Sequence, residues 1–111
     1  MLADTWIYKP KKDAWTERKP ETHPKPRGNH YLVWADHLKA LLLVGGSGPN
    51  GVASDAWVYE TSENRWTQVR IAKWPASAGL GAGAYVPKAK LFLSYNLKSG
   101  KTWVLEVRQI K

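Results

Sequence analysis

The sequence predicts an all-β protein made of repeated units of four short antiparallel strands. Two stretches, residues 3–18 and 54–69, share one pattern in which a tryptophan precedes a tyrosine by two positions and a second tryptophan by nine. The 111 residues include seven Trp and five Tyr, which favour strands, and nine Gly and seven Pro, which favour turns. This composition is typical of short strands alternating with turns, and not of a disordered chain.

The two stretches align at a constant spacing of 51 residues. The aligned pairs are Asp4 with Asp55, Trp6 with Trp57, Tyr8 with Tyr59, Trp15 with Trp66 and Thr16 with Thr67. The same spacing aligns KALLLV at residues 39–44 with KLFLSY at residues 90–95. A third, shortened copy is KTWVLEV at residues 101–107, where Trp103 follows Trp57 by 46 positions. The loop after the second strand of that unit is therefore about five residues shorter.

The middle unit is the complete one, and each of its strands has its own signature. The expected strands are residues 29–35, 39–45, 55–60 and 65–69. Asp36 and His37 mark the first turn, and the near-continuous apolar run of the second strand predicts burial on both faces. The third strand alternates, so that Trp57 and Tyr59 share one face and Val58 takes the other.

The order of the strands divides a single segment, residues 1–111, into one complete unit and two partial ones. Residues 1–20 supply strands three and four of a first unit, residues 27–70 a complete unit, and residues 78–108 strands one to three of a last unit. Alternating glycines at 79, 81 and 83 predict a closely packed strand in the last unit. Repeated four-stranded units of about 40 to 50 residues are typical of β-propeller blades, which bury large aromatic side chains between neighbouring sheets.

The complete unit resembles the kelch repeat. The residues that carry the resemblance are Arg27 and His30 around the first strand, Gly45-Gly46 after the second, and Trp57, Tyr59 and Trp66. The last unit departs from this pattern, with Ala78, Gly81 and Leu105 at the positions of Arg27, His30 and Tyr59. The resemblance implies structural roles for nine repeated residues, namely Trp6, Tyr8, Trp15, Gly45, Gly46, Trp57, Tyr59, Trp66 and Trp103.

A closed propeller needs roughly four blades or more, for which 111 residues are too few. Three interpretations stay open: a fragment, one protomer of a ring closed by several copies, or a chain that docks its open edges on another chain. Because unpaired strand edges favour association, we expect closure by self-association or by another chain rather than a stable monomer.

No catalytic, metal or cofactor site is predicted. His23, His30 and His37 lie in a loop, at a strand start and in a turn, so we do not expect them to converge on one metal ion. The glycine-rich loop at residues 45–51 lacks the Gly-Lys-Ser/Thr sequence of a phosphate-binding loop. The aspartate repeated before the third strand predicts a carboxylate that binds local backbone amides.

The strand order predicts long loops at one end of the sheets and tight turns at the other. The long-loop end contains the candidate partner-binding residues Arg27, Asn50 and Trp74. The turn end carries the lysines Lys9, Lys11, Lys12, Lys88 and Lys90. The net charge is +8, but the turns offer no interleaved aromatic residues for base stacking, so nucleic acid is not the expected partner.

The predicted function is that of a non-enzymatic protein-interaction module, which binds another protein or further copies of itself. The alternative is a piece of a carbohydrate-binding or sugar-active kelch enzyme. The resemblance implies that a copper oxidase of that kind needs a cysteine crosslink, and the chain has no Cys. Without cysteine the sequence leaves the compartment open, and no apolar stretch reaches the roughly 18 residues of a membrane span.

Overall fold

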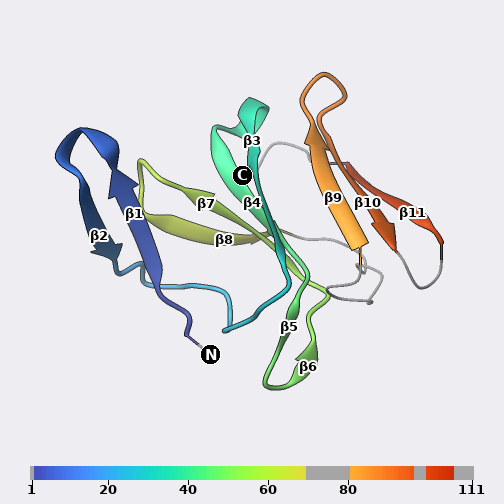
Figure 1. Ribbon diagram of the computed structural model, residues 1–111, viewed down its shortest axis with the longest axis horizontal. Coiled ribbons are helices and arrows are strands. Elements are labelled where there is room, and N and C mark those ends of the chain that lie inside the picture. The colour runs from blue at the N-terminus through green and yellow to red at the C-terminus, as the bar shows by residue number, and fades with distance from the viewer. Residues whose placement is uncertain (1, 70–80, 97–99, 107–111) are drawn as a thin grey trace.

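The computed structural model describes residues 2–69, 81–96 and 100–106, which form strands, loops and two short 3-10 helices, η1 (Pro10–Lys12) and η2 (Asp36–Leu38), without an α-helix. Strands β1 (Thr5–Lys9) and β2 (Ala14–Arg18) form an N-terminal hairpin. Strands β3 (Tyr31–Ala35), β4 (Ala40–Val44), β7 (Ala56–Glu60) and β8 (Arg65–Val69) form a central sheet in that order. A C-terminal sheet contains strands β9 (Gly81–Val86), β10 (Leu91–Asn96) and β11 (Thr102–Glu106). A short ribbon contains strands β5 (Ser47–Gly48) and β6 (Gly51–Val52) (Figure 1).

All pairings between these strands are antiparallel. The structure therefore confirms the predicted all-β class and a four-stranded antiparallel sheet in the middle of the chain. The β5–β6 ribbon was not predicted, because the glycine-rich sequence of residues 45–51 indicates a loop. A strand of two residues has no periodicity from which it could be predicted.

The repeat in the sequence recurs in the register of the strands. Leu42 of β4 lies opposite Val58 of β7, and Leu93 of β10 lies opposite Val104 of β11. Leu93 follows Leu42 by 51 positions, whereas Val104 follows Val58 by 46. The connection between these two strands is therefore five residues shorter in the C-terminal sheet, as the sequence predicts.

The tight turns of the hairpins repeat as well. Asp13 and Asn64 have left-handed φ angles of 46° and 49°, and Lys39 and Lys90 have φ angles of 52° and 55°. The members of each pair are 51 residues apart and close equivalent hairpins. Lys39 and Lys90 each donate a backbone N–H to the carbonyl three residues earlier, at 3.1 and 3.2 Å. One turn geometry thus recurs although the sequences of the turns differ.

The core lies between the central sheet and the C-terminal sheet. Leu42 and Val44 of β4 form one buried cluster with Phe92 of β10, and all three are 0% exposed. The ring of Tyr31 packs tilted against that of Phe92, with centroids 5.2 Å apart. A Cβ at Gly83 would lie only 2.6 Å from Phe92 and 2.8 Å from Tyr31. Glycine at position 83 therefore allows β9 to approach β3 closely, as the sequence predicts, whereas Gly79 of the same pattern lies outside the described residues.

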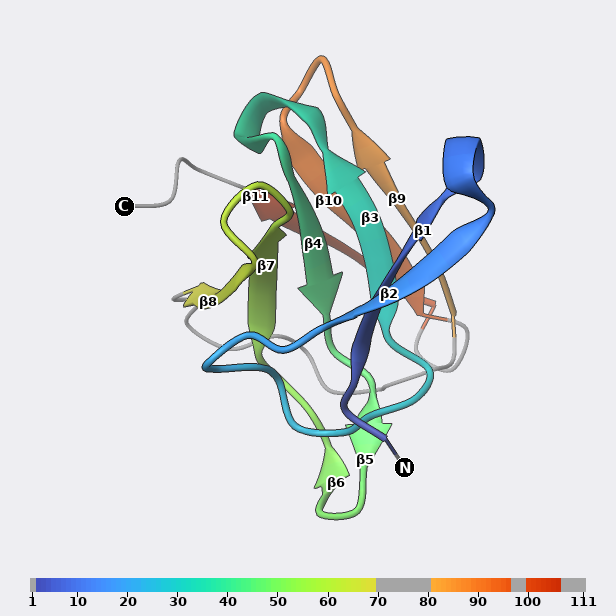
Figure 2. The same ribbon diagram turned by 90° about the vertical axis from the view of Figure 1, so that its left-hand side faces the viewer.

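The three sheets follow one another across the molecule in chain order (Figure 1). The turns of the β1–β2, β3–β4 and β9–β10 hairpins lie at one end, and the β5–β6 ribbon lies at the opposite end (Figure 2). We call these the turn end and the loop end. Within the part of the chain that the structure describes, no helix is long and apolar enough to cross a bilayer.

Candidate interaction site at the loop end

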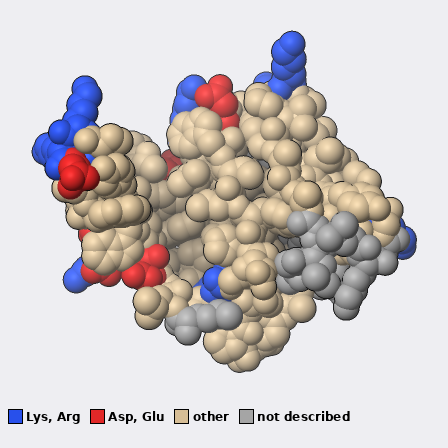
Figure 3. All heavy atoms as spheres, viewed as in Figure 1, with Lys and Arg blue, Asp and Glu red and all other residues tan. Residues whose placement is uncertain are grey.

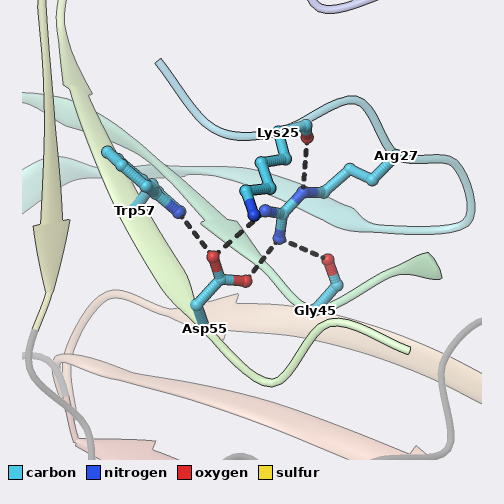
Figure 4. Close-up of polar contacts among 5 residues, drawn as sticks. All are labelled: Lys25, Arg27, Gly45, Asp55 and Trp57. Atoms are coloured by element: carbon cyan, nitrogen blue, oxygen red, sulfur yellow. Dashed lines mark hydrogen bonds and ion pairs between the residues drawn. The ribbon is translucent and has the colours of Figure 1, made fainter. Parts of the chain in front are cut away.

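A largely buried ion pair organises the loop end of the central sheet (Figure 4). Arg27 donates from its two terminal nitrogens to the Asp55 carboxylate at 2.6 and 3.1 Å, and to the carbonyl of Gly45 at 3.0 Å. Trp57 donates its indole N–H to the same carboxylate at 2.8 Å. The side chain of Arg27 is 6% exposed and that of Asp55 is 27% exposed. Charge-assisted hydrogen bonds of this bidentate kind are among the strongest in proteins.

The loop that carries Arg27 is held close to the end of β4. Gly28 and Ser47 exchange two backbone hydrogen bonds of 2.8 and 2.9 Å, which fix this loop over the start of β5. Gly46 lies beneath the loop with a φ of 101°, and a Cβ at this position would lie 2.7 Å from the carbonyl oxygen of Gly28. Gly46 thus supplies both the left-handed backbone and the space that the Arg27 loop requires.

The pKa of the Asp55 carboxyl lies below its usual 3.8, chiefly because Arg27 donates to it, while partial burial acts in the opposite direction. The sequence predicts that this aspartate binds local backbone amides, and a backbone hydrogen bond at Asp55 itself does contribute to the lowered pKa. Its side-chain donors are the guanidinium of Arg27, 28 residues away, and the indole of Trp57. Asp55 therefore joins two distant segments in addition to its local backbone bond.

Half of this cluster is repeated in the N-terminal hairpin. Asp4 accepts the indole N–H of Trp6 at 2.7 Å, as Asp55 accepts that of Trp57. Among residues 2–69, 81–96 and 100–106, however, Asp4 forms no ion pair. The last unit has Lys101 at the position of Asp55 and Ala78 at the position of Arg27. The two partners of the ion pair are thus replaced together.

A cavity of about 310 Å³, the loop cavity, lies between the Arg27 loop and the β5–β6 ribbon. Arg27 and Asn50, two of the three candidate partner-binding residues, both line it. Asn50 is exposed, whereas the polar atoms of Arg27 bind within the protein. The third candidate, Trp74, lies outside the described residues. The structure therefore places Asn50 where a ligand could reach it, and gives Arg27 an internal role.

A second hollow, the hairpin groove, separates β1 from the central sheet and has a volume of about 270 Å³. Figure 3 shows the surface hollowed between the two. Ile7 lines the groove from β1, and Leu32 and Leu41 line it from the central sheet. Trp66 joins the two sides, since its indole N–H donates to the hydroxyl of Thr5 at 3.2 Å. The groove is therefore largely apolar and is bounded by two sheets that remain connected.

His30 also lines the hairpin groove. Its Nδ1 is buried and has no hydrogen-bond partner among the described residues. Burial, and to a lesser degree the charge of Arg27, hold the pKa of His30 below its usual 6.5. The folded protein therefore favours the neutral imidazole.

We expect the free energy of unfolding to fall as the pH drops below 6.5, the usual pKa of histidine. Because the folded-state pKa of His30 is lowered, the unfolded chain takes up the proton first. The stability that neutral His30 contributes is complete above 6.5 and is lost as the pH falls through the folded-state pKa. Urea unfolding from about pH 7 to about pH 5 measures this loss. His30→Gln should flatten the dependence, whereas His23→Gln in an exposed loop should not; equal slopes for the wild type and His30→Gln would contradict the prediction.

The turn end is basic. Its five predicted lysines are exposed, and Figure 3 shows basic side chains at the tips of the hairpins. His37 of the β3–β4 turn stacks on Tyr85 of β9 with ring centroids 5.8 Å apart, and the two share a hydrogen bond. The described residues contain no group of three His, Cys, Asp or Glu side chains that could hold a metal ion. Through its contact with Tyr85, His37 connects two hairpins, which the sequence does not predict.

The repeated aromatic residues occupy equivalent positions but differ in exposure. The rings of Tyr59 and Trp66 have centroids 4.9 Å apart, and those of Tyr8 and Trp15 lie 5.1 Å apart at a similar tilt. Tyr59 faces the N-terminal hairpin and is 1% exposed, whereas Trp15 is 65% exposed and Trp6 is 47% exposed. Trp15 of the hairpin thus stays uncovered, whereas its equivalent in the central sheet, Trp66, is partly buried.

The chain matches no family model. A curated relative is the tRNA wybutosine-synthesizing protein 2/3/4 of Oryza sativa subsp. japonica, which is 36% identical over 64 residues. The match covers 57% of this chain and 6% of the rice protein. The chain therefore spans a small part of the length of this relative.

Proposed function

We propose that the chain is a segment of a kelch-type β-propeller that binds protein and does not catalyse a reaction. The central sheet is its complete blade, and the N-terminal hairpin and the C-terminal sheet are partial blades. The observation that carries this proposal is the recurrence of one register and one turn geometry at a spacing of 51 residues, in sheets that pack face to face.

Open edges and uncovered faces support a binding function. The N-terminal hairpin has two described strands and the C-terminal sheet three, against four in the central sheet. Trp15 on the first and Tyr95 on the last of these sheets are 65% and 45% exposed. Strand edges and apolar faces of this kind favour association with further β-sheets. We therefore propose that the propeller is completed by self-association or by another chain.

The mass of the protein in solution tests this function. We expect size-exclusion chromatography with light scattering to give a mass above the 12.5 kDa of one chain, and the mass to rise with concentration. Trp15→Glu on the outer face of the hairpin should reduce association, because a charge is costly in a buried sheet interface. Lys88→Glu at the exposed turn end is the control. A strictly monomeric chain that retains no protein ligand would overturn the proposal.

The alternative function is that of a piece of a carbohydrate-binding or sugar-active kelch protein. The observation that favours it is the loop cavity of about 310 Å³, in which Asn50 could donate and accept hydrogen bonds. A glycan array and the shift in Tm on adding sugars discriminate between the two functions. The rice relative is named for wybutosine synthesis on tRNA, but it matches over 6% of its length, so we propose no substrate on that ground.

A further inference from the structure

Among the described residues, the N-terminal hairpin lacks two strands whose equivalents are present in the C-terminal sheet. The hairpin groove lies where these two strands would be. Phe92 and Tyr85 of the C-terminal sheet are covered by the β3–β4 hairpin, and Phe92 is 0% exposed. The residues 51 positions earlier are Leu41 and Trp34, on the face of the central sheet that is turned toward the groove. Trp34 is 45% exposed, and its neighbour Leu32 is 49% exposed. The central sheet thus lacks, on this face, the hairpin that covers the equivalent residues of the next sheet.

Strand β1 offers a matching backbone edge. In the central sheet, β7 pairs with β4 along residues 56–59. The equivalent residues of β1 are 5–8, and three of them line the groove. On that side β1 has no neighbouring strand within the described residues. A strand laid in the groove would therefore find both unpaired backbone groups and an apolar floor, the two requirements of strand addition.

The negative charge on Asp4 indicates which residue type a segment bound in the groove should carry. Asp4 lines the groove and holds the same bond to a tryptophan as Asp55 does. Asp55 is paired with Arg27, which lies in the loop shortly before β3, the first strand of its own sheet. By the same geometry, an arginine at the equivalent position of the segment that fills the groove would pair with Asp4.

We infer that the hairpin groove binds a β-hairpin of a partner protein, whose second strand pairs with β1 and whose arginine, placed before its first strand, pairs with Asp4. This inference rests on the proposed function, and it names the site and the chemistry of the partner. The pattern to expect in that hairpin is the one in residues 25–46 of this chain, with apolar side chains facing Leu32 and Leu41.

The C-terminal sheet of a second copy does not fit this description. It has three strands, and together with the two strands of the hairpin these make five, one more than the four of the central sheet. It also carries Ala78 at the position of Arg27, so it brings no arginine to Asp4. The C-terminal sheet of a second copy is therefore not the occupant.

A peptide that copies residues 25–46, fused to a soluble carrier, serves as the probe for the intact chain. We expect it to bind and to protect the backbone amides of β1 from hydrogen exchange. Asp4→Asn should weaken binding roughly tenfold, the loss typical of one charge-assisted pair, and Trp6 keeps its acceptor in this variant. Glu17→Gln, an exposed change on β2, is the matched control and should leave the affinity unchanged.

A charge exchange makes the test specific. A peptide with Arg27→Asp should bind the wild-type protein poorly and should be rescued by Asp4→Arg in the protein. No binding of the wild-type peptide, or equal affinity for wild type and Asp4→Asn, would overturn this inference. If the chain still associates with itself in the same samples, the proposed function stands and only the groove assignment fails. A chain that stays monomeric and captures neither peptide nor protein overturns the proposed function itself.

Discussion

Replacing Arg27 with alanine should lower the free energy of unfolding by about 3 kcal/mol, near the lower end of the range for breaking a buried ion pair. The substitution leaves the Asp55 carboxylate without its bidentate donor and the carbonyl of Gly45 without its side-chain donor. We expect a loss of free energy near the lower end of that range because Asp55 is 27% exposed, so water replaces part of the hydrogen bonding that Arg27 supplied. Urea unfolding followed by tryptophan fluorescence measures the change.

An exposed ion pair in the same sheet provides the control. Arg65 binds Glu60 at 3.0 Å, but its side chain is 58% exposed, so Arg65→Ala should cost less than about 1 kcal/mol. Arg27→Lys should recover only part of the loss, because an ammonium group cannot reproduce the bidentate geometry. Equal losses for Arg27→Ala and Arg65→Ala would show that burial does not strengthen the Arg27 pair.

The strands could be predicted because their signals are local and are repeated. The apolar run of β4 and the alternation of β7 each lie within a few residues, and the 51-residue spacing transfers the assignment from one unit to the next. The repeat also predicts the register of the strands, since the equivalent residues Leu42 and Leu93 lie opposite equivalent valines of the neighbouring strands. Whether these sheets belong to a closed propeller stays a prediction.

The ion pair could not be predicted in the same way, because its partners are 28 residues apart and only Asp55 has a matching residue, Asp4, in another unit. The position of Arg27 in a loop predicts partner binding, and in the structure its guanidinium binds Asp55 and Gly45 within the protein. One signal was present in the sequence: the last unit replaces Arg27 and Asp55 together, by Ala78 and Lys101. Joint replacement is expected of interacting residues, but the last unit also replaces His30 and Tyr59, by Gly81 and Leu105, so the signal is not specific to this pair.

Exposure of the aromatic residues could not be predicted from the repeat either. Trp66 and Trp15 occupy equivalent positions, but the first is partly buried and the second is 65% exposed. The difference arises from what lies against each sheet, not from the residues themselves. Sequence equivalence predicts where a side chain points, and the neighbouring sheet decides whether it is buried.

The packing of the central sheet against the C-terminal sheet is tested by Phe92→Ala, which should lower the free energy of unfolding by about 3–5 kcal/mol. Phe92 is 0% exposed and packs on Tyr31, so its removal leaves a cavity between two sheets. Leu93→Ala is a matched control, since Leu93 lies on the opposite face of β10 and is 38% exposed. It should cost less than about 1.5 kcal/mol, because much of its side chain stays in water in the folded protein. Urea unfolding of both variants measures the difference, and a Phe92→Ala loss as small as that of Leu93→Ala would mean that the two sheets do not share a core in solution.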